Sequence, residues 1–247
     1  MDKIKIEDKK FLNYCIMVFL IFMIGSIFGC ILETLLISVK LQALEIRKGL
    51  IYGPFVQVYG MGTVIYYILF EIINKERVEG KDIIKENRKE NIKEKRKSRG
   101  ILIWIQIFLI SMFLGGITEY VCSFLLEIFT GKVSWDYSNY FMNFNGRTSM
   151  SYMLIWGAIG ILFGKFIYPL FKKIEKVIYI KWFRKFILVI FIFMCFNAWV
   201  SAVSTLRQIE REDKIEAKGN LDIFLDKYYP DELLNKIYHN RYDAEEL

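Results

Sequence analysis

Two glutamates, Glu33 and Glu119, are the residues best placed for chemistry, because each lies inside a long apolar run. Inserting a carboxylate into hydrocarbon costs about 3 kcal/mol on insertion scales. Such a group therefore faces a cavity, pairs with a partner or is protonated. Both glutamates lie past the midpoint of their runs. The pair predicts a polar site inside a membrane. The alternative is structural, with each glutamate hydrogen-bonded to a neighbouring helix.

The elements that position these glutamates follow from the apolar runs. Hydrophobic residues make up 54% of the 247-residue chain, and the charged residues are gathered in blocks between the runs. Runs of this length cross a bilayer as helices. We expect an all-α polytopic transmembrane helix bundle over residues 1–204 and an amphipathic C-terminal tail over 205–247. The bundle has about five transmembrane helices, at about 11–39, 55–73, 101–129, 149–171 and 183–204.

The distribution of Lys and Arg predicts the orientation. Segments 1–10, 74–100 and 172–185 hold 4, 11 and 6 of them, or 21 in all, whereas the two other loops hold 3 and 2, or five in all. Basic loops stay in the cytoplasm. We therefore expect a multi-pass protein of the bacterial plasma membrane, with the N-terminus in the cytoplasm and the C-terminus outside. Both glutamates then lie in the outer half.

The cytoplasmic loop 74–100 has lysines and acids at intervals of four, which places each set on one face of a helix. This spacing predicts a charged helical loop, either a helix of its own or a solvated extension of the two flanking helices. In the tail, Pro230 followed by two acids is typical of a helix start.

Other polar side chains belong to the same outer layer. Arg47 and Arg147 supply charge opposite to that of the glutamates, and Gly49, Gly53 and Pro54 predict a re-entrant turn. An interfacial belt is the alternative for the aromatic residues. The candidate polar cluster, substrate-binding or structural, consists of Glu33, Arg47, Tyr52, Tyr59, Glu119, Trp135, Asp136, Tyr137, Asn145 and Arg147.

The sequence carries none of the common catalytic or metal-binding motifs. There is no phosphate-binding GxxxxGK[ST] loop, the one histidine is His239 in the tail, and the four cysteines lie singly in apolar runs. We assign no catalytic residue, metal or cofactor. The net charge is +7, but most of the basic residues lie in segments that flank the apolar runs. This placement argues against nucleic acid as a partner.

Three stretches carry a resemblance to a known family. They are Arg47–Phe55 with Tyr59–Gly62, Glu119–Glu127, and Trp135–Ser138 with Phe144–Arg147. Over roughly residues 20–165 the chain resembles the putative ABC-transporter type IV (CmpB-like) family of bacterial membrane permeases. It departs from the family in having Lys48 between Arg47 and Gly49, and Gln57 in place of a usual proline. The resemblance implies a permease subunit of the plasma membrane.

Three functions fit these observations. The first is a transport subunit with an outward-facing polar site, energised by a separate ATPase that docks on the cytoplasmic loops 74–100 and 172–185. The second is a membrane-embedded enzyme acting on a lipid or envelope substrate, which requires Glu33, Glu119, Asp136 and Arg147 to converge. The third is a non-catalytic accessory or sensor protein. The lipid bilayer is a partner in each case, and an oligomer is compatible with all three.

Overall fold

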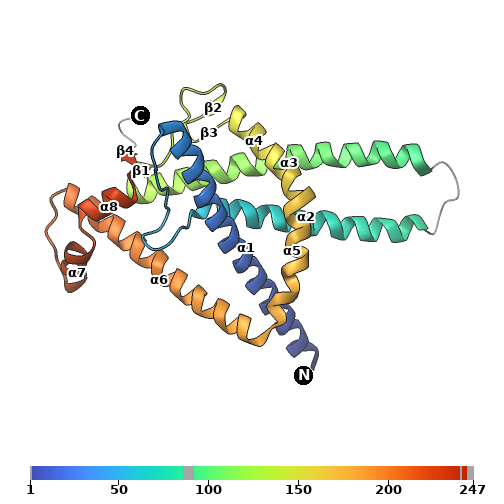
Figure 1. Ribbon diagram of the computed structural model, residues 1–247, viewed down its shortest axis with the longest axis horizontal. Coiled ribbons are helices and arrows are strands. Elements are labelled where there is room, and N and C mark those ends of the chain that lie inside the picture. The colour runs from blue at the N-terminus through green and yellow to red at the C-terminus, as the bar shows by residue number, and fades with distance from the viewer. Residues whose placement is uncertain (1, 86–91, 240, 244–247) are drawn as a thin grey trace.

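Figure 1 shows a computed structural model of the chain, in which long helices dominate and short strands occur only at one end. It describes the backbone of residues 2–85, 92–239 and 241–243, and the side chains of residues 11–75, 100–239 and 241. Four helices in this part of the chain are long and apolar enough to cross a membrane. They are Phe11–Leu41, Gly100–Thr130, Met150–Tyr179 and Lys181–Glu212.

The predicted second span is helical but is not one of those four. The helix α2 (Gln57–Lys85) begins at Gln57 and carries Glu71 in its apolar part. Its stretch 57–73 rises only about 25 Å at 1.5 Å per residue, less than the hydrocarbon core of about 30 Å. By length and composition, the described residues thus hold four of the about five expected spans. The predicted charged loop 74–100 lies partly outside the described residues, since α2 ends at Lys85 and α3 begins at Ile92.

The membrane helices pair as two antiparallel hairpins, α1 (Asp2–Leu41) with α2, and α3 (Ile92–Thr130) with α4 (Met150–Leu162). Small residues allow the helix backbones to approach closely. A side chain at Gly25 would overlap Thr63, and one at Gly160 would overlap Ser111. Figure 1 shows α2 and α3 side by side over much of their length.

The chain after α4 bends before it returns as a helix. A π-helical turn (η1, Phe163–Ile167), α5 (Tyr168–Ile174) and a 3-10 turn (η2, Glu175–Tyr179) lead to the long helix α6 (Lys181–Glu212). Pro169 has no N–H to donate within this stretch, which accounts for the widened turn before it. The main core packs this bend against α1, α2 and α3. It consists of Met17, Ile21, Tyr66, Tyr67, Phe70, Ile107, Phe163, Tyr168, Phe171 and Ile178.

The loop 42–56, called the re-entrant loop below, folds back between α1 and α6 as its glycines predict. The amide of Val56 donates to the carbonyl of Ser26, near the middle of the first span, at 3.1 Å. Asn197 of α6 bonds both the N–H and the C=O of Tyr52, at 3.1 and 2.7 Å, while the amide of Ile51 donates to Ser201. Helix side chains thus satisfy backbone groups that lipid could not.

The tail packs on the end of α6. Helices α7 (Asn220–Tyr228) and α8 (Asp231–Ile237) bury Leu225 and Leu234 against Ile51 of the re-entrant loop. The strand β4 (Tyr242–Asp243) pairs with β1 (Lys132–Val133), and β2 (Asn143–Phe144) pairs with β3 (Thr148–Ser149). The re-entrant loop, the loop 131–149 and the tail therefore gather at the end of the molecule opposite the N-terminus (Figure 1).

Candidate functional site

Glu119 is a buried carboxylate near the end of α3, with only 6% of its surface exposed. It accepts hydrogen bonds from the hydroxyl of Tyr137 at 3.0 Å and from the hydroxyl of Thr148 at 2.8 Å. The Trp156 side chain of α4 lies within hydrogen-bonding reach as well. In the described part of the chain these neutral donors surround it without an ion-paired Lys or Arg. The group can thus hold a proton or face a cation.

The loop 131–149 brings these two donors to Glu119 because it is fastened to itself. The indole N–H of Trp135 donates to the carbonyl of Arg147 at 2.9 Å, and the amide of Tyr137 donates to the carbonyl of Gly146 at 2.8 Å. Asp136 accepts from the amide and hydroxyl of Ser138. Gly146 has a φ of +66°, a conformation that glycine adopts freely. Trp135 and Asp136 therefore shape the loop.

A row of tyrosines connects Glu119 with the surface. The Tyr137 ring stacks on Tyr152 of α4 with centroids 4.0 Å apart, and Tyr140 packs edge-on against both rings. Tyr140 is 44% exposed. Burial, and then the negative charge of Glu119, raise the pKa of the Tyr137 hydroxyl, which therefore stays protonated and donates. The ring contacts of this tyrosine row thus extend from the donor of Glu119 to an exposed side chain.

Glu33 lies on α1 beside Tyr59 of α2 and Arg47 of the re-entrant loop, and is half-buried. The backbone of Arg47 is held by α1, since its N–H donates to the hydroxyl of Thr34 and its carbonyl accepts from the thiol of Cys30. Tyr59 is close enough to feel the charge of both Glu33 and Glu119. Tyr59 thus lies beside Glu33 and within electrostatic range of Glu119.

Arg147, which could supply charge opposite to that of Glu119, pairs with Glu127 instead. The two charged groups are 2.5 Å apart. The guanidinium also lies over the rings of Tyr120 and Phe124, each at 5.4 Å, which favours a cation. Arginine pairs with the glutamate two turns along the helix because the loop 131–149 places it over the end of α3.

Tyr52 and Asn145 lie apart from the glutamates. The hydroxyl of Tyr52 meets that of Tyr229 in the tail at 2.8 Å. The exposed Asn145 has a φ of +51°, and its amide donates to the hydroxyl of Tyr120. The structure therefore divides the predicted cluster. Glu33, Arg47, Tyr59, Glu119 and Tyr137 form the polar region, while the remaining members hold loops in place.

The two hairpins repeat one arrangement around their glutamates. In the first, a side chain at Gly29 would overlap Tyr59, whose hydroxyl reaches Glu33 four residues further along α1. In the second, a side chain at Gly115 would overlap Trp156, which reaches Glu119 at the same spacing. The sequence Gly-x-x-x-Glu, which occurs at 29–33 and at 115–119, thus corresponds to a repeated glycine–aromatic–glutamate contact.

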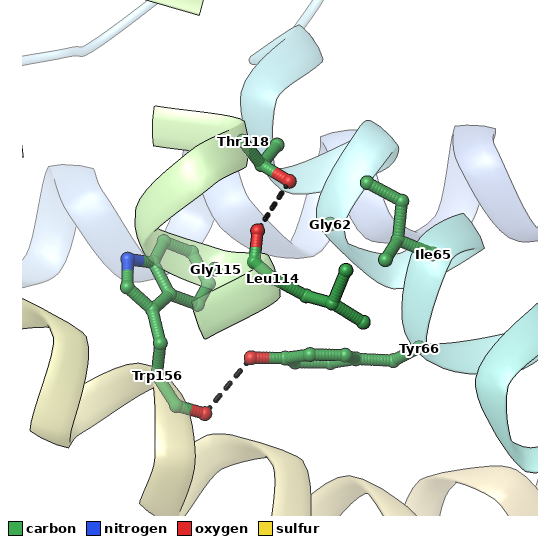
Figure 2. A pocket seen from close by; sticks show the side chains of 7 residues that line it. All are labelled: Gly62, Ile65, Tyr66, Leu114, Gly115, Thr118 and Trp156. Carbon is green, nitrogen blue, oxygen red and sulfur yellow. Dashed lines mark hydrogen bonds between the residues drawn. The ribbon is translucent and has the colours of Figure 1, made fainter. Parts of the chain in front are cut away.

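A small apolar pocket adjoins this region where the two hairpins meet (Figure 2). Gly62 of α2, Gly115 of α3 and Trp156 of α4 line it, together with Ile65, Tyr66, Leu114 and Thr118. The Tyr66 hydroxyl donates to the carbonyl of Trp156 at 2.8 Å, and that of Thr118 donates to the carbonyl of Leu114. Trp156 therefore forms a wall of the pocket on one side and approaches Glu119 on the other.

Sequence reasoning did not single out Thr148, Tyr152 or Trp156. Thr148 follows Arg147 directly, and Tyr152 and Trp156 are one turn apart on α4, but nothing in their spacing indicates a contact with Glu119. Among the described residues there is no group of three His, Cys, Asp or Glu side chains that could hold a metal ion.

Comparison with known proteins places the chain in a family. The family model for the putative ABC-transporter type IV proteins matches residues 20–202, most of the chain. The match contains α1 from residue 20, the rest of both hairpins, the re-entrant loop and α6 as far as residue 202, but not the tail. No curated protein and no solved structure matches the chain.

Proposed function

Because the chain belongs to the putative ABC-transporter type IV family, we propose that it is a transport subunit with an outward-facing polar site. The family and the four apolar helices indicate a membrane transport-related protein. The proposal adds that Glu33, Tyr59 and Glu119 form the site, and that a separate ATPase energises it.

The observation that carries the proposal is the setting of Glu119. It is a buried carboxylate inside a membrane span, held by the neutral donors Tyr137 and Thr148. An acid in this position is expensive and marks a functional pathway in membrane proteins. The tyrosine row gives it a route to the surface, and Glu33 supplies a second carboxylate. Such a site suits a cation or a polar substrate with a positively charged group.

We take α2 to be the fifth crossing, entered through the re-entrant loop instead of from the surface. With five crossings and the basic segments in the cytoplasm, both loops and the tail lie outside. The gathering of loops and tail at one end supports placing them all on the same membrane face, and the basic segments assign that face to the outside. The protein is then a multi-pass subunit of the bacterial plasma membrane.

Energy has to come from another chain in this proposal, because the sequence has no phosphate-binding loop of its own. The ATPase would dock at the cytoplasmic end, where α2 ends at Lys85 and α3 begins at Ile92, or at the corner before α6.

The test is purification of the full chain from its host in mild detergent, followed by identification of what comes with it. We expect a stoichiometric partner that carries a phosphate-binding loop. A preparation free of any ATPase, reproduced in lipid nanodiscs, would contradict the proposal and favour an accessory role. The enzyme alternative requires Asp136 and Arg147 to join the two glutamates, whereas Asp136 bonds Ser138 and Arg147 pairs with Glu127.

A further inference from the structure

The corner between α5 and α6, residues 171–186, lies between two membrane spans and has no role in the site. One span ends at Tyr179 and the next begins at Lys181. Phe171 and Ile178 are 3% and 2% exposed and anchor the corner in the main core. The backbone of the corner is therefore held by the core, and its remaining side chains lie at one membrane surface.

The corner is strongly basic. It holds six Lys and Arg and one acid, Glu175, a net charge of +5 from those counts. Lys172 satisfies Glu175 at 2.7 Å and also contacts Glu71 at 3.1 Å. Of the other five, Arg184 is half-buried and four lysines are exposed, and none of these lysines forms an ion pair with a side chain in the described part of the chain. These corner lysines are Lys173, Lys176, Lys181 and Lys185.

Large aromatic side chains are exposed beside the corner lysines. Tyr179 is 62% exposed, Trp182 67% and Phe186 53%. On α6, Trp182 and Phe186 are one turn apart and form a stripe, and Lys181 and Lys185 form a second stripe next to it. Exposed aromatic rings are costly in water but favourable at the boundary between acyl chains and headgroups.

We propose that this corner binds the headgroups of anionic phospholipids in the adjoining leaflet. The aromatic stripe would enter the acyl boundary while the corner lysines reach the phosphates above it. The lipid-facing side chains Phe166 and Leu170 continue from the corner into the span, which places the lysines at headgroup level. A protein partner would have to cover the same rings at membrane depth, so the lipid is the better fit.

This inference goes beyond the proposed function and does not depend on it. It assigns the corner to lipid, which removes one of the two docking places named for the ATPase and leaves the ends of α2 and α3.

The experiment uses the full-length protein in vesicles that mix phosphatidylcholine with phosphatidylglycerol, one of the two brominated. Bromine quenches nearby tryptophan, and subtracting the signal of Trp182→Phe isolates the reporter at the corner. We expect phosphatidylglycerol to be preferred on the order of fivefold, the effect of about one lysine near an anionic surface. Replacing all four corner lysines by Gln should bring the preference close to one, and high salt should weaken it in the wild type.

The matched control replaces four exposed tail lysines, Lys214, Lys218, Lys227 and Lys236, by Gln. It removes the same charge and should keep the preference. The proposal is overturned if the wild type shows no preference, if the corner variant keeps it, or if the tail variant loses it equally. A corner variant that keeps its lipid preference but loses a copurifying protein would assign the corner to a protein partner instead.

Discussion

At the residue scale, the central question is what solvates a carboxyl group within a membrane span. For Glu119 the answer is two hydroxyls and an indole, contributed by the loop 131–149 and by α4. Glu33 has different partners, since Tyr59 and the charge of Arg47 lie near it. The two glutamates are therefore not interchangeable. Glu119 depends on hydrogen bonds alone, and we expect it to respond more strongly to loss of a donor.

Replacing Tyr137 by Phe tests this dependence. The variant keeps the ring that stacks on Tyr152 but removes the donor to Glu119. Loss of a hydrogen bond to a buried polar group should cost about 1–3 kcal/mol. Thermal unfolding in detergent measures the change. Tyr228→Phe, at a tyrosine that is 53% exposed, should leave stability unchanged. Equal stability of both variants would mean that Tyr137 does not hold the carboxyl group.

At the element scale, the glycines of the two hairpins set the distance between helices. Gly29→Ala and Gly115→Ala should each destabilise the protein by about 1–3 kcal/mol, because the added methyl group would overlap Tyr59 or Trp156. Gly100→Ala on α3 is the control, since nothing lies within 4 Å of the added group. That variant should be as stable as the wild type or slightly more so. A tolerated alanine at both hairpin positions would refute the close approach, as read by thermal unfolding.

The re-entrant loop depends on Asn197 in the same way. Asn197→Leu would leave the N–H and C=O of Tyr52 unpaired between helices. We expect destabilisation of about 2–3 kcal/mol or more, and faster proteolysis within residues 42–56. Asn13→Leu on α1 is the comparison, because its side-chain oxygen has no partner in the described structure. If the loop is cut no faster in Asn197→Leu, its backbone must be held by other groups.

Sequence reasoning recovered four of the predicted membrane spans because length and hydropathy alone define them. It placed the end of the last helix at Ser204, whereas α6 continues to Glu212. The charges that suggested an end are paired instead, with Arg207 and Arg211 both bonded to Asp226 of the tail. The re-entrant loop could be predicted from its glycines, because their backbone freedom is a local property. The donors to Glu119 could not be predicted, because it is the fold of the loop 131–149 that brings them to α3.

At the scale of the whole molecule, the tail ties the two loops together. It pairs with β1 within the loop 131–149, contacts Tyr52 of the re-entrant loop through Tyr229, and places His239 2.7 Å from Glu45. Arg207, only 4% exposed, anchors the tail to α6 through Asp226. The walls of the polar region are therefore held from one end by a segment outside the family match.

The acid sensitivity of the tail follows from Asp226. Its hydrogen bonds from Arg207, and then from Arg211, lower its pKa from 3.8 to about 2. A lowered pKa stabilises the docked tail above about pH 4, and this contribution is lost as the pH falls through about 2. Pepsin digestion between pH 4.5 and 2 should cut the tail only near the lower limit. In Arg207→Gln the cut should appear at higher pH, and identical profiles would exclude Asp226 as the cause.

The central claim is that the polar site opens to the outside, and labelling in intact cells tests it most directly. After the four native cysteines are replaced, Tyr140→Cys places a thiol at the outer end of the tyrosine row, and Lys176→Cys places one at the corner before α6. If the site opens to the outside, a membrane-impermeant maleimide should label position 140 in intact cells and position 176 only after permeabilisation. Labelling of position 176 but not 140 in intact cells would invert the orientation and contradict the outward-facing site.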